Sequence, residues 1–136
     1  MNNKTKKITA LAVFLLVLII AVLFVLSMGV SADVSDTKVK VTSFWYSEKI
    51  SFSDIESVNI YTEFDYGERL SVIGFIGSYR GTYKNELLGE YECAANKDVD
   101  ACIVVRLKSG EYYVFNSDDR ATTSSVYNHI KARVMK

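Results

Sequence analysis

The stretch Ile103–Phe115 reads Ile-Val-Val-Arg-Leu-Lys-Ser-Gly-Glu-Tyr-Tyr-Val-Phe and largely determines the architecture expected for the C-terminal hundred residues. Two runs rich in β-branched and aromatic residues flank Lys-Ser-Gly, a pattern typical of a β-hairpin. A two-residue turn at Ser109-Gly110 would bring apolar partners and opposite charges into register. The expected cross-strand pairs are Lys108 with Glu111, Leu107 with Tyr112, and Val105 with Val114.

A second hairpin is expected immediately upstream. It joins Gly89–Ala94 to Ala101–Leu107 around the polar stretch Asn96-Lys97-Asp98-Val99. A turn at Lys97-Asp98 would place Cys93 directly opposite Cys102, where Cα atoms of antiparallel strands approach to about 4.5–5.5 Å. That separation lies within disulfide range.

Further upstream, the pattern predicts more strands and few helical signals. Lys38–Tyr46 and Ile55–Tyr61 alternate side chains between two faces and are predicted strands, with a turn-like break at Ser51–Asp54. Thr62–Gly81 is glycine-rich, which favours bends or bulges. The small, polar stretch Ser31–Thr37 is predicted to be a linker.

The chain ends in a predicted helix. Ser117 is the expected N-cap, and Asp118 and Asp119 would occupy the first turn, where the helix dipole favours acids. An apolar face recurs at helical spacing and consists of Val126, Tyr127, Ile130 and Val134. The order of elements predicts a mainly-β domain over residues 38–136: a bent antiparallel sheet or partly open barrel closed by a C-terminal helix.

The N-terminal segment predicts a membrane anchor. Residues 8–28 form an uncharged apolar run, and 21 residues at about 1.5 Å each match a bilayer core of about 30 Å. A cleaved signal remains the alternative, because Val30-Ser31-Ala32 resembles a cleavage site, but signal cores are usually shorter. Residues 1–30 are therefore assigned to a cytoplasmic stub and transmembrane anchor. The basic residues before it, Lys4, Lys6 and Lys7, predict a cytoplasmic N-terminus and an extracytoplasmic domain.

Composition and motifs give little indication of catalysis. Residues 33–136 hold thirteen basic and sixteen acidic residues, so this part is not a typical nucleic-acid binder. His129 is the only histidine, no nucleophile motif accompanies it, and an edge position on the final helix is the expected role. Asn96–Asp100 resembles the start of a calcium loop, but Ala101 and Leu107 break that pattern. We expect neither a cofactor nor a metal site, and no enzymatic activity.

In its order of motifs the chain resembles bacterial pleckstrin-homology-like (PH-like) domains attached to membrane segments. The motifs that carry the resemblance are Ile50–Val58, Gly67–Leu70, Gly81–Tyr83, Leu88–Tyr91, Ile103–Phe115 and Asn116–Asp119. The resemblance covers roughly residues 38–134 and implies a seven-stranded, barrel-like sandwich with a C-terminal helix. The fold hosts phosphoinositide binders, peptide binders and scaffolds, so it does not select a ligand.

Two candidate sites follow from the residues. Cys93 and Cys102 are expected to form a disulfide, because an extracytoplasmic domain folds in an oxidising compartment. A recognition surface rich in Tyr and Arg is the second candidate, and ordinary strand composition is its alternative. Its residues are Tyr66, Arg69, Tyr79, Arg80 and Tyr83.

The function expected from the sequence is a non-catalytic, membrane-tethered binding or scaffolding module displayed outside the cytoplasm. The alternatives are an accessory subunit of a larger membrane complex and a hydrolase whose site has no recognised motif. The expected partners are the lipid bilayer, through residues 8–28, and another membrane or envelope protein, with no nucleic acid.

Overall fold

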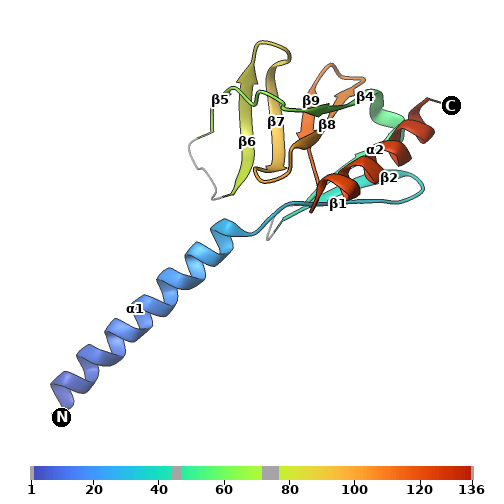
Figure 1. Cartoon of the computed structure of the whole chain (residues 1–136). Coiled ribbons are helices and arrows are strands. Elements are labelled where there is room, and N and C mark those ends of the chain that lie inside the picture. The colour runs from blue at the N-terminus through green and yellow to red at the C-terminus, as the bar shows by residue number, and fades with distance from the viewer. Residues whose placement is uncertain (1, 44–46, 72–76, 136) are drawn as a thin grey trace.

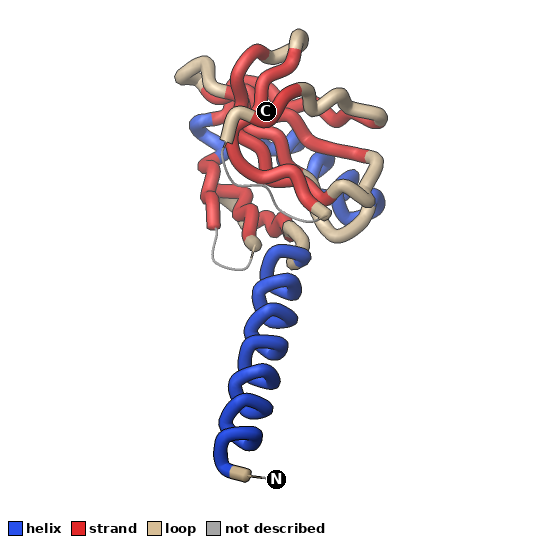
Figure 2. Tube along the Cα trace, turned by 90° about the vertical axis from the view of Figure 1, so that its left-hand side faces the viewer, coloured by secondary structure: helices blue, strands red, loops and turns tan. Residues whose placement is uncertain are grey.

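A computed structural model describes residues 2–43, 47–71 and 77–135 and consists of one long helix attached to a β-rich domain (Figure 1). Helix α1 (Asn3–Ser27) extends away from the domain, with the N-terminus at its far end. Figure 2, turned by 90°, shows the same separation, with α1 below and the strands above. The predicted fold class, an N-terminal apolar helix followed by a mainly-β PH-like domain, is confirmed.

The domain contains an antiparallel sheet, a larger sheet that is antiparallel except for one parallel pair of strands, and a C-terminal helix. The three-stranded sheet comprises β1 (Ser31–Val34), β2 (Lys38–Thr42) and β3 (Ser47–Ser51), in that order. A 3₁₀ turn, η1 (Phe52–Asp54), leads into the six-stranded sheet, whose order is β4-β8-β9-β7-β6-β5. Its strands are β4 (Ile55–Thr62), β5 (Glu68–Arg69), β6 (Ser78–Asn85), β7 (Gly89–Asn96), β8 (Ala101–Leu107) and β9 (Tyr112–Phe115). Helix α2 (Arg120–Val134) completes the chain.

The main core lies between the two sheets and α2. Strand alternation turns Val39 and Val41 of β2 inward while the lysines between and beside them stay exposed. Helical spacing brings Val126 and Ile130 of α2 onto the same core, with Tyr127 and Val134 packed at its border. The predicted apolar face of the final helix is confirmed.

The first predicted hairpin is wrong. β7 does not pair with β8, because β9 lies between them, parallel to β7 and antiparallel to β8. The physical reason is the apolar stretch Tyr113–Phe115, which is buried throughout and therefore needs a neighbouring strand on each side. The short loop between β7 and β8, residues 97–100, passes the end of β9 at Phe115.

The second predicted hairpin is confirmed, but its register is wrong by one residue. Val105 pairs with Tyr113, and Val104 pairs with Val114. The loop has three residues rather than two: the amide of Leu107 donates to the carbonyl of Glu111 (2.8 Å) and Gly110 has a φ of 94°. A positive φ at the third loop position is typical of this longer hairpin loop, and glycine permits it.

The segment expected to be a linker, residues 31–37, contains a strand. Ser31–Val34 forms β1, paired with β2 from Ser31↔Thr42 to Val34↔Val39. Val30 and Ala32 are buried while Asp33 is exposed, so this short segment alternates like a strand. The predicted strand Lys38–Tyr46 forms β2 only to Thr42, and residues 44–46 lie outside the described part.

The final helix starts two residues later than predicted. Asp119 is the N-cap of α2, and its carboxylate accepts the amide of Thr122 (2.7 Å), which holds the pKa of Asp119 below its usual range. Ser117, the expected cap, is buried and bonds instead to β1. The interaction that displaces it, between the Ala32 amide and the Ser117 hydroxyl (3.1 Å), joins residues 85 positions apart.

Candidate binding surfaces and the anchor joint

Helix α1 is long and apolar enough to cross a membrane. The segment Asn3–Val25 spans 23 residues and none of it is buried against the domain. Its large apolar side chains are exposed all around, which suits contact with lipid rather than a protein core. The same length and composition also fit a signal sequence.

Arg80 caps the end of this helix. Its Nη2 donates to the carbonyl oxygen of Met28, the C-cap residue, and its Nε donates to the Ser78 hydroxyl (2.9 Å). The Arg80 side chain is 7% exposed, and burial lowers its pKa from the usual value. A cation at a helix C-terminus is electrostatically favourable. Arg80 therefore connects the helix to strand β6.

Asn96 holds the next residue after the helix. Its Oδ1 accepts the amide of Val30 (2.7 Å), and its Nδ2 donates to the carbonyls of Val30 (2.8 Å) and Ser117 (2.9 Å). Asn96 is 6% exposed. At Gly29, an added Cβ would lie 2.9 Å from the Asn96 Oδ1, so only glycine leaves this approach open. We call Arg80, Asn96 and the chain from Met28 to Val30 the anchor joint.

A buried polar network extends the anchor joint into the domain. Asn116 accepts the Asn96 amide (2.7 Å) and donates to the carbonyls of Asn96 and Ala101 (both 3.1 Å). The Ser117 amide donates to the Thr123 hydroxyl (2.9 Å), which brings α2 into the network. Buried polar groups that are satisfied in this way favour one arrangement, and the network therefore holds the residues just after the helix against the domain.

Three of the five predicted recognition residues lie together. Tyr66 and Tyr79 stack with ring centroids 3.9 Å apart, and Tyr79 meets Tyr83 edge-on at 5.9 Å. Phe64 and Tyr91 join them, and the Tyr91 hydroxyl donates to the Tyr66 carbonyl. These residues form a second core on the other face of the six-stranded sheet, which we call the aromatic cluster.

The two predicted arginines lie elsewhere. Arg80 points to the opposite face of β6 from Tyr79 and Tyr83, as strand alternation requires, and belongs to the anchor joint. Arg69, on the short edge strand β5, is exposed beside Tyr83. Burial raises the pKa of Tyr66 and of Tyr83, so both rings act as packing residues with neutral hydroxyls.

The expected pairing of Cys93 with Cys102 is wrong. Cys93 pairs in register with Gly81 and Val114, and Cys102 pairs with Tyr61. With β9 between their strands, the separation spans two strand spacings, about 9–10 Å, beyond the limit of roughly 7 Å for a disulfide. Both thiols are free and buried in the aromatic cluster.

Both thiols should be unreactive in the folded protein. Burial raises the pKa of Cys93 and raises the pKa of Cys102 to about 12, so at pH 8 both stay protonated. Alkylation by iodoacetamide, followed by intact mass, should be slower than in guanidinium by about two orders of magnitude or more. Equal rates in native and unfolded protein would contradict the burial of these side chains.

The same pKa shift has a consequence for stability. The pKa of Cys102 is higher in the folded state than the ordinary value of 9.0. The neutral thiol therefore contributes to folding stability in full at pH values below 9.0. This contribution is lost as the pH rises from about 9 toward 12. Thermal unfolding should therefore move to lower temperature over this range, and less so in Cys102→Ala.

A groove of about 440 Å³ lies between the two sheets. Its floor is buried and apolar and includes Ile50 of β3 and Tyr113 of β9. Its rim carries four exposed glutamates: Glu48, Glu90, Glu92 and Glu111. The sequence alone does not indicate this groove, because the four residues come from β3, β7 and the loop before β9, which only the tertiary structure brings together.

The described residues contain no group of three or more His, Cys, Asp or Glu side chains that could hold a metal ion. His129 packs against Phe52, with ring centroids 6.1 Å apart, and its Nε2 lies 3.3 Å from the carbonyl of Ser35. It therefore acts as a contact between α2, η1 and the β1–β2 turn, the edge-of-helix role expected from the sequence.

Comparison with known proteins identifies the domain. The model of the bacterial PH domain family matches residues 30–122, a span that starts within the anchor joint and reaches the first turn of α2. Searches of the curated proteins and of the solved structures return no match. The matched span includes β1, whose pairing with β2 makes the segment after the helix part of the domain. The chain therefore belongs to the bacterial PH domain family, carried behind an N-terminal apolar helix.

Proposed function

We propose that this protein is a non-catalytic binding module held at the membrane surface and displayed outside the cytoplasm. The anchor joint is the observation that carries the proposal. Arg80 bonds to the C-cap residue of α1, Met28, and Asn96 bonds to both backbone groups of Val30, so no flexible linker separates the helix from the domain in this arrangement. A rigid connection of this kind keeps a binding surface at a fixed height and orientation above the bilayer.

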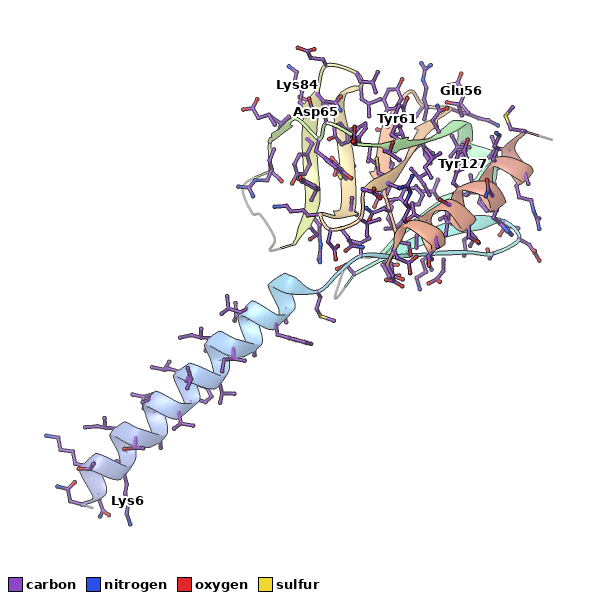
Figure 3. All side chains as sticks on the ribbon, viewed as in Figure 1. Lys6, Glu56, Tyr61, Asp65, Lys84 and Tyr127 are labelled. Carbon is purple, nitrogen blue, oxygen red and sulfur yellow. The ribbon has the colours of Figure 1, made fainter. Side chains whose placement is uncertain are left out.

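The orientation rests on charge. Lys4, Lys6 and Lys7 precede the apolar segment, and basic residues of this kind are retained on the cytoplasmic side. In Figure 3, Lys6 lies at the end of α1 remote from the domain. The domain is then on the opposite side of the bilayer from these lysines.

The binding role rests on the family and on the shape of the domain. PH-like domains typically bind rather than catalyse, and the described residues offer a groove with an apolar floor and a polar rim, the usual form of a recognition site. The partner we propose is another membrane or envelope protein. The aromatic cluster, which includes Tyr66, Tyr79 and Tyr83, supports the groove from the far face of the same sheet.

Affinity purification of the full-length protein from cross-linked cell membranes tests this role. The matched control carries residues 1–28 fused to an unrelated β-domain. We expect a partner protein that is enriched by the full chain and absent with the control. Capture of the same proteins by the full chain and by the control would show that only residues 1–28 associate with them. An enzymatic activity of the full chain that is lost in His129→Ala would contradict the non-catalytic role.

A further inference from the structure

The groove between the sheets is bordered by a strand edge without a partner strand. Among the residues that the structure describes, β3 pairs with β2 and with no other strand. Glu48 of β3 lies on one side of the groove, β6 and β7 lie on the opposite side, and Ile50 of β3 forms part of the floor between them. The free edge of β3 and the groove are therefore parts of one surface.

The register shows which backbone groups face that free edge. The amide of Phe52 donates to the carbonyl of Thr37 (2.9 Å), which makes that pair hydrogen-bonded. In an antiparallel ladder hydrogen-bonded pairs alternate with non-bonded pairs, so Ile50 and Glu48 also bond to β2. Lys49, between them, and Ser47, before Glu48, belong to the non-bonded pairs and direct their amide and carbonyl groups outward. These groups are available to an added strand.

The charge of the groove is of one sign. Glu48, Glu90, Glu92 and Glu111 are exposed on its rim, and no lysine or arginine lines it. Within the described parts of the chain, none of the four takes part in an ion pair, and Glu92 accepts a hydrogen bond from the Thr82 hydroxyl (2.7 Å). An occupant with lysine or arginine side chains would complement these carboxylates.

The β6–β7 wall of the groove runs to the end of the domain that is remote from the anchor, whereas Glu48, near the start of β3, lies closer to the anchor joint. β6 starts at Ser78, beside the anchor joint, and runs to Asn85, where it turns into β7. Figure 3 shows Lys84, the register partner of Glu90, at the end of the domain opposite α1. A negatively charged groove in this place would repel anionic lipid, so a protein segment suits it better than a bilayer.

We propose that this groove docks an extended segment of a partner protein, which adds to the free edge of β3 as a further strand and places alternate lysine or arginine side chains against the rim glutamates. The inference rests on the proposed function and names the chemistry of the partner. Backbone bonds to Lys49 and Ser47 provide affinity, and the rim charges provide selectivity for basic sequences.

A labelled peptide tests the docking. The probe is a capped Thr-Lys-Val-Lys-Val-Lys-Thr peptide, titrated into the full chain in phosphatidylcholine nanodiscs, with fluorescence anisotropy as the readout. Two analogues carry N-methyl groups on the lysines or on the valines. Because one edge of an added strand faces β3 and the other faces away, one analogue should bind about tenfold more weakly and the other should be nearly unaffected. Equal affinity of all three peptides would overturn strand addition.

Matched variants test the rim. Glu90→Gln with Glu92→Gln should weaken peptide binding about tenfold, whereas Glu68→Gln with Glu86→Gln changes net charge equally outside the groove and should change binding less than about twofold. Equal loss in both would mean that only general charge attracts the peptide. A glutamate-containing peptide that binds as well as the lysine peptide would overturn the charge complementarity.

Lys49→Pro removes one outward backbone N–H group and should abolish binding of the peptide. Lys49→Ala keeps that N–H group and should leave peptide binding intact. If the peptide does not bind, the proposed docking site is wrong. The site is also wrong if the groove binds only calcium ions and if that binding, rather than peptide binding, depends on the rim glutamates. The tethered module would still stand in that case, because a partner captured from membranes could contact another surface.

Discussion

Asn96→Asp should lower the free energy of unfolding of the full-length protein by roughly 3–5 kcal/mol, the cost of leaving a buried charge without its partners. The Asn96 amide donates to the carbonyls of Val30 and Ser117 and accepts the amide of Val30. An ionised carboxylate keeps the acceptor but loses both donors. Two buried carbonyls then face a negative charge instead of an N–H group.

The size of this effect should depend on pH. A carboxyl group buried among carbonyls has its pKa raised above the unfolded value of about 3.9, because the charged form is disfavoured. The penalty is therefore present above the folded-state pKa and is relieved as the pH falls through it. Urea denaturation in detergent micelles, followed by circular dichroism at two pH values, measures both quantities.

The control is Asn59→Asp, the same chemical change at an exposed position of β4. It should alter the unfolding free energy by less than about 0.5 kcal/mol. If Asn96→Asp were no more destabilising than this control, the connection between the anchor and the domain would not depend on the buried network.

Ile130→Asp should destabilise the domain by about 3 kcal/mol or more. Ile130 has no exposed surface and packs in the main core against residues of both sheets. Aspartate there removes apolar contacts and buries an unpaired carboxylate in the interface between α2 and the sheets. Because α2 closes one side of the core, its loss would expose that side to water.

Asn128→Asp is the matched control for this change, since Asn128 is exposed on the same helix. Thermal unfolding by circular dichroism should show a lower midpoint for Ile130→Asp and a midpoint near wild type for Asn128→Asp. A midpoint that is unchanged in Ile130→Asp would mean that α2 is not packed on the core.

The elements that local pattern specifies could be predicted from the sequence. Residues 8–28 predicted α1, the alternation in Ile55–Tyr61 predicted β4, and the apolar spacing of Val126 and Ile130 predicted the buried face of α2. In each case one continuous segment of the chain carries the whole signal. Pattern at this range does not depend on which strands become neighbours.

The predictions that failed depended on strand order. Whether Cys93 faces Cys102 is decided by the insertion of β9 between their strands, and Tyr113–Phe115 could pair with either of them as far as local pattern shows. The register of the β8–β9 hairpin depended on whether Gly110 stands second or third in the loop, since both positions suit glycine.

The anchor joint could not be predicted from the sequence for a related reason, because its contacts join residues that are far apart in the chain. Asn96 appeared to be a polar residue at a hairpin tip, and nothing local indicates that its amide reaches Val30, 66 positions earlier. Arg80 could have been separated from Tyr79 and Tyr83 by alternation along β6, which puts neighbouring residues on opposite faces. The four rim glutamates gather only when β3, β7 and the loop before β9 are placed in three dimensions.

Labelling of single cysteines on intact cells measures most directly whether the domain is tethered by a retained helix and lies outside the cytoplasm. The variants are Ser109→Cys, at the exposed β8–β9 loop, and Asn3→Cys, at the start of α1. The buried thiols of Cys93 and Cys102 give little background. The reagent is a maleimide that does not cross membranes, applied to spheroplasts, whose cytoplasmic membrane is intact. We expect Ser109→Cys to be labelled before lysis and Asn3→Cys to be labelled only after lysis. Labelling of Asn3→Cys but not Ser109→Cys before lysis, or mature protein that lacks residues 1–30, would contradict the proposal.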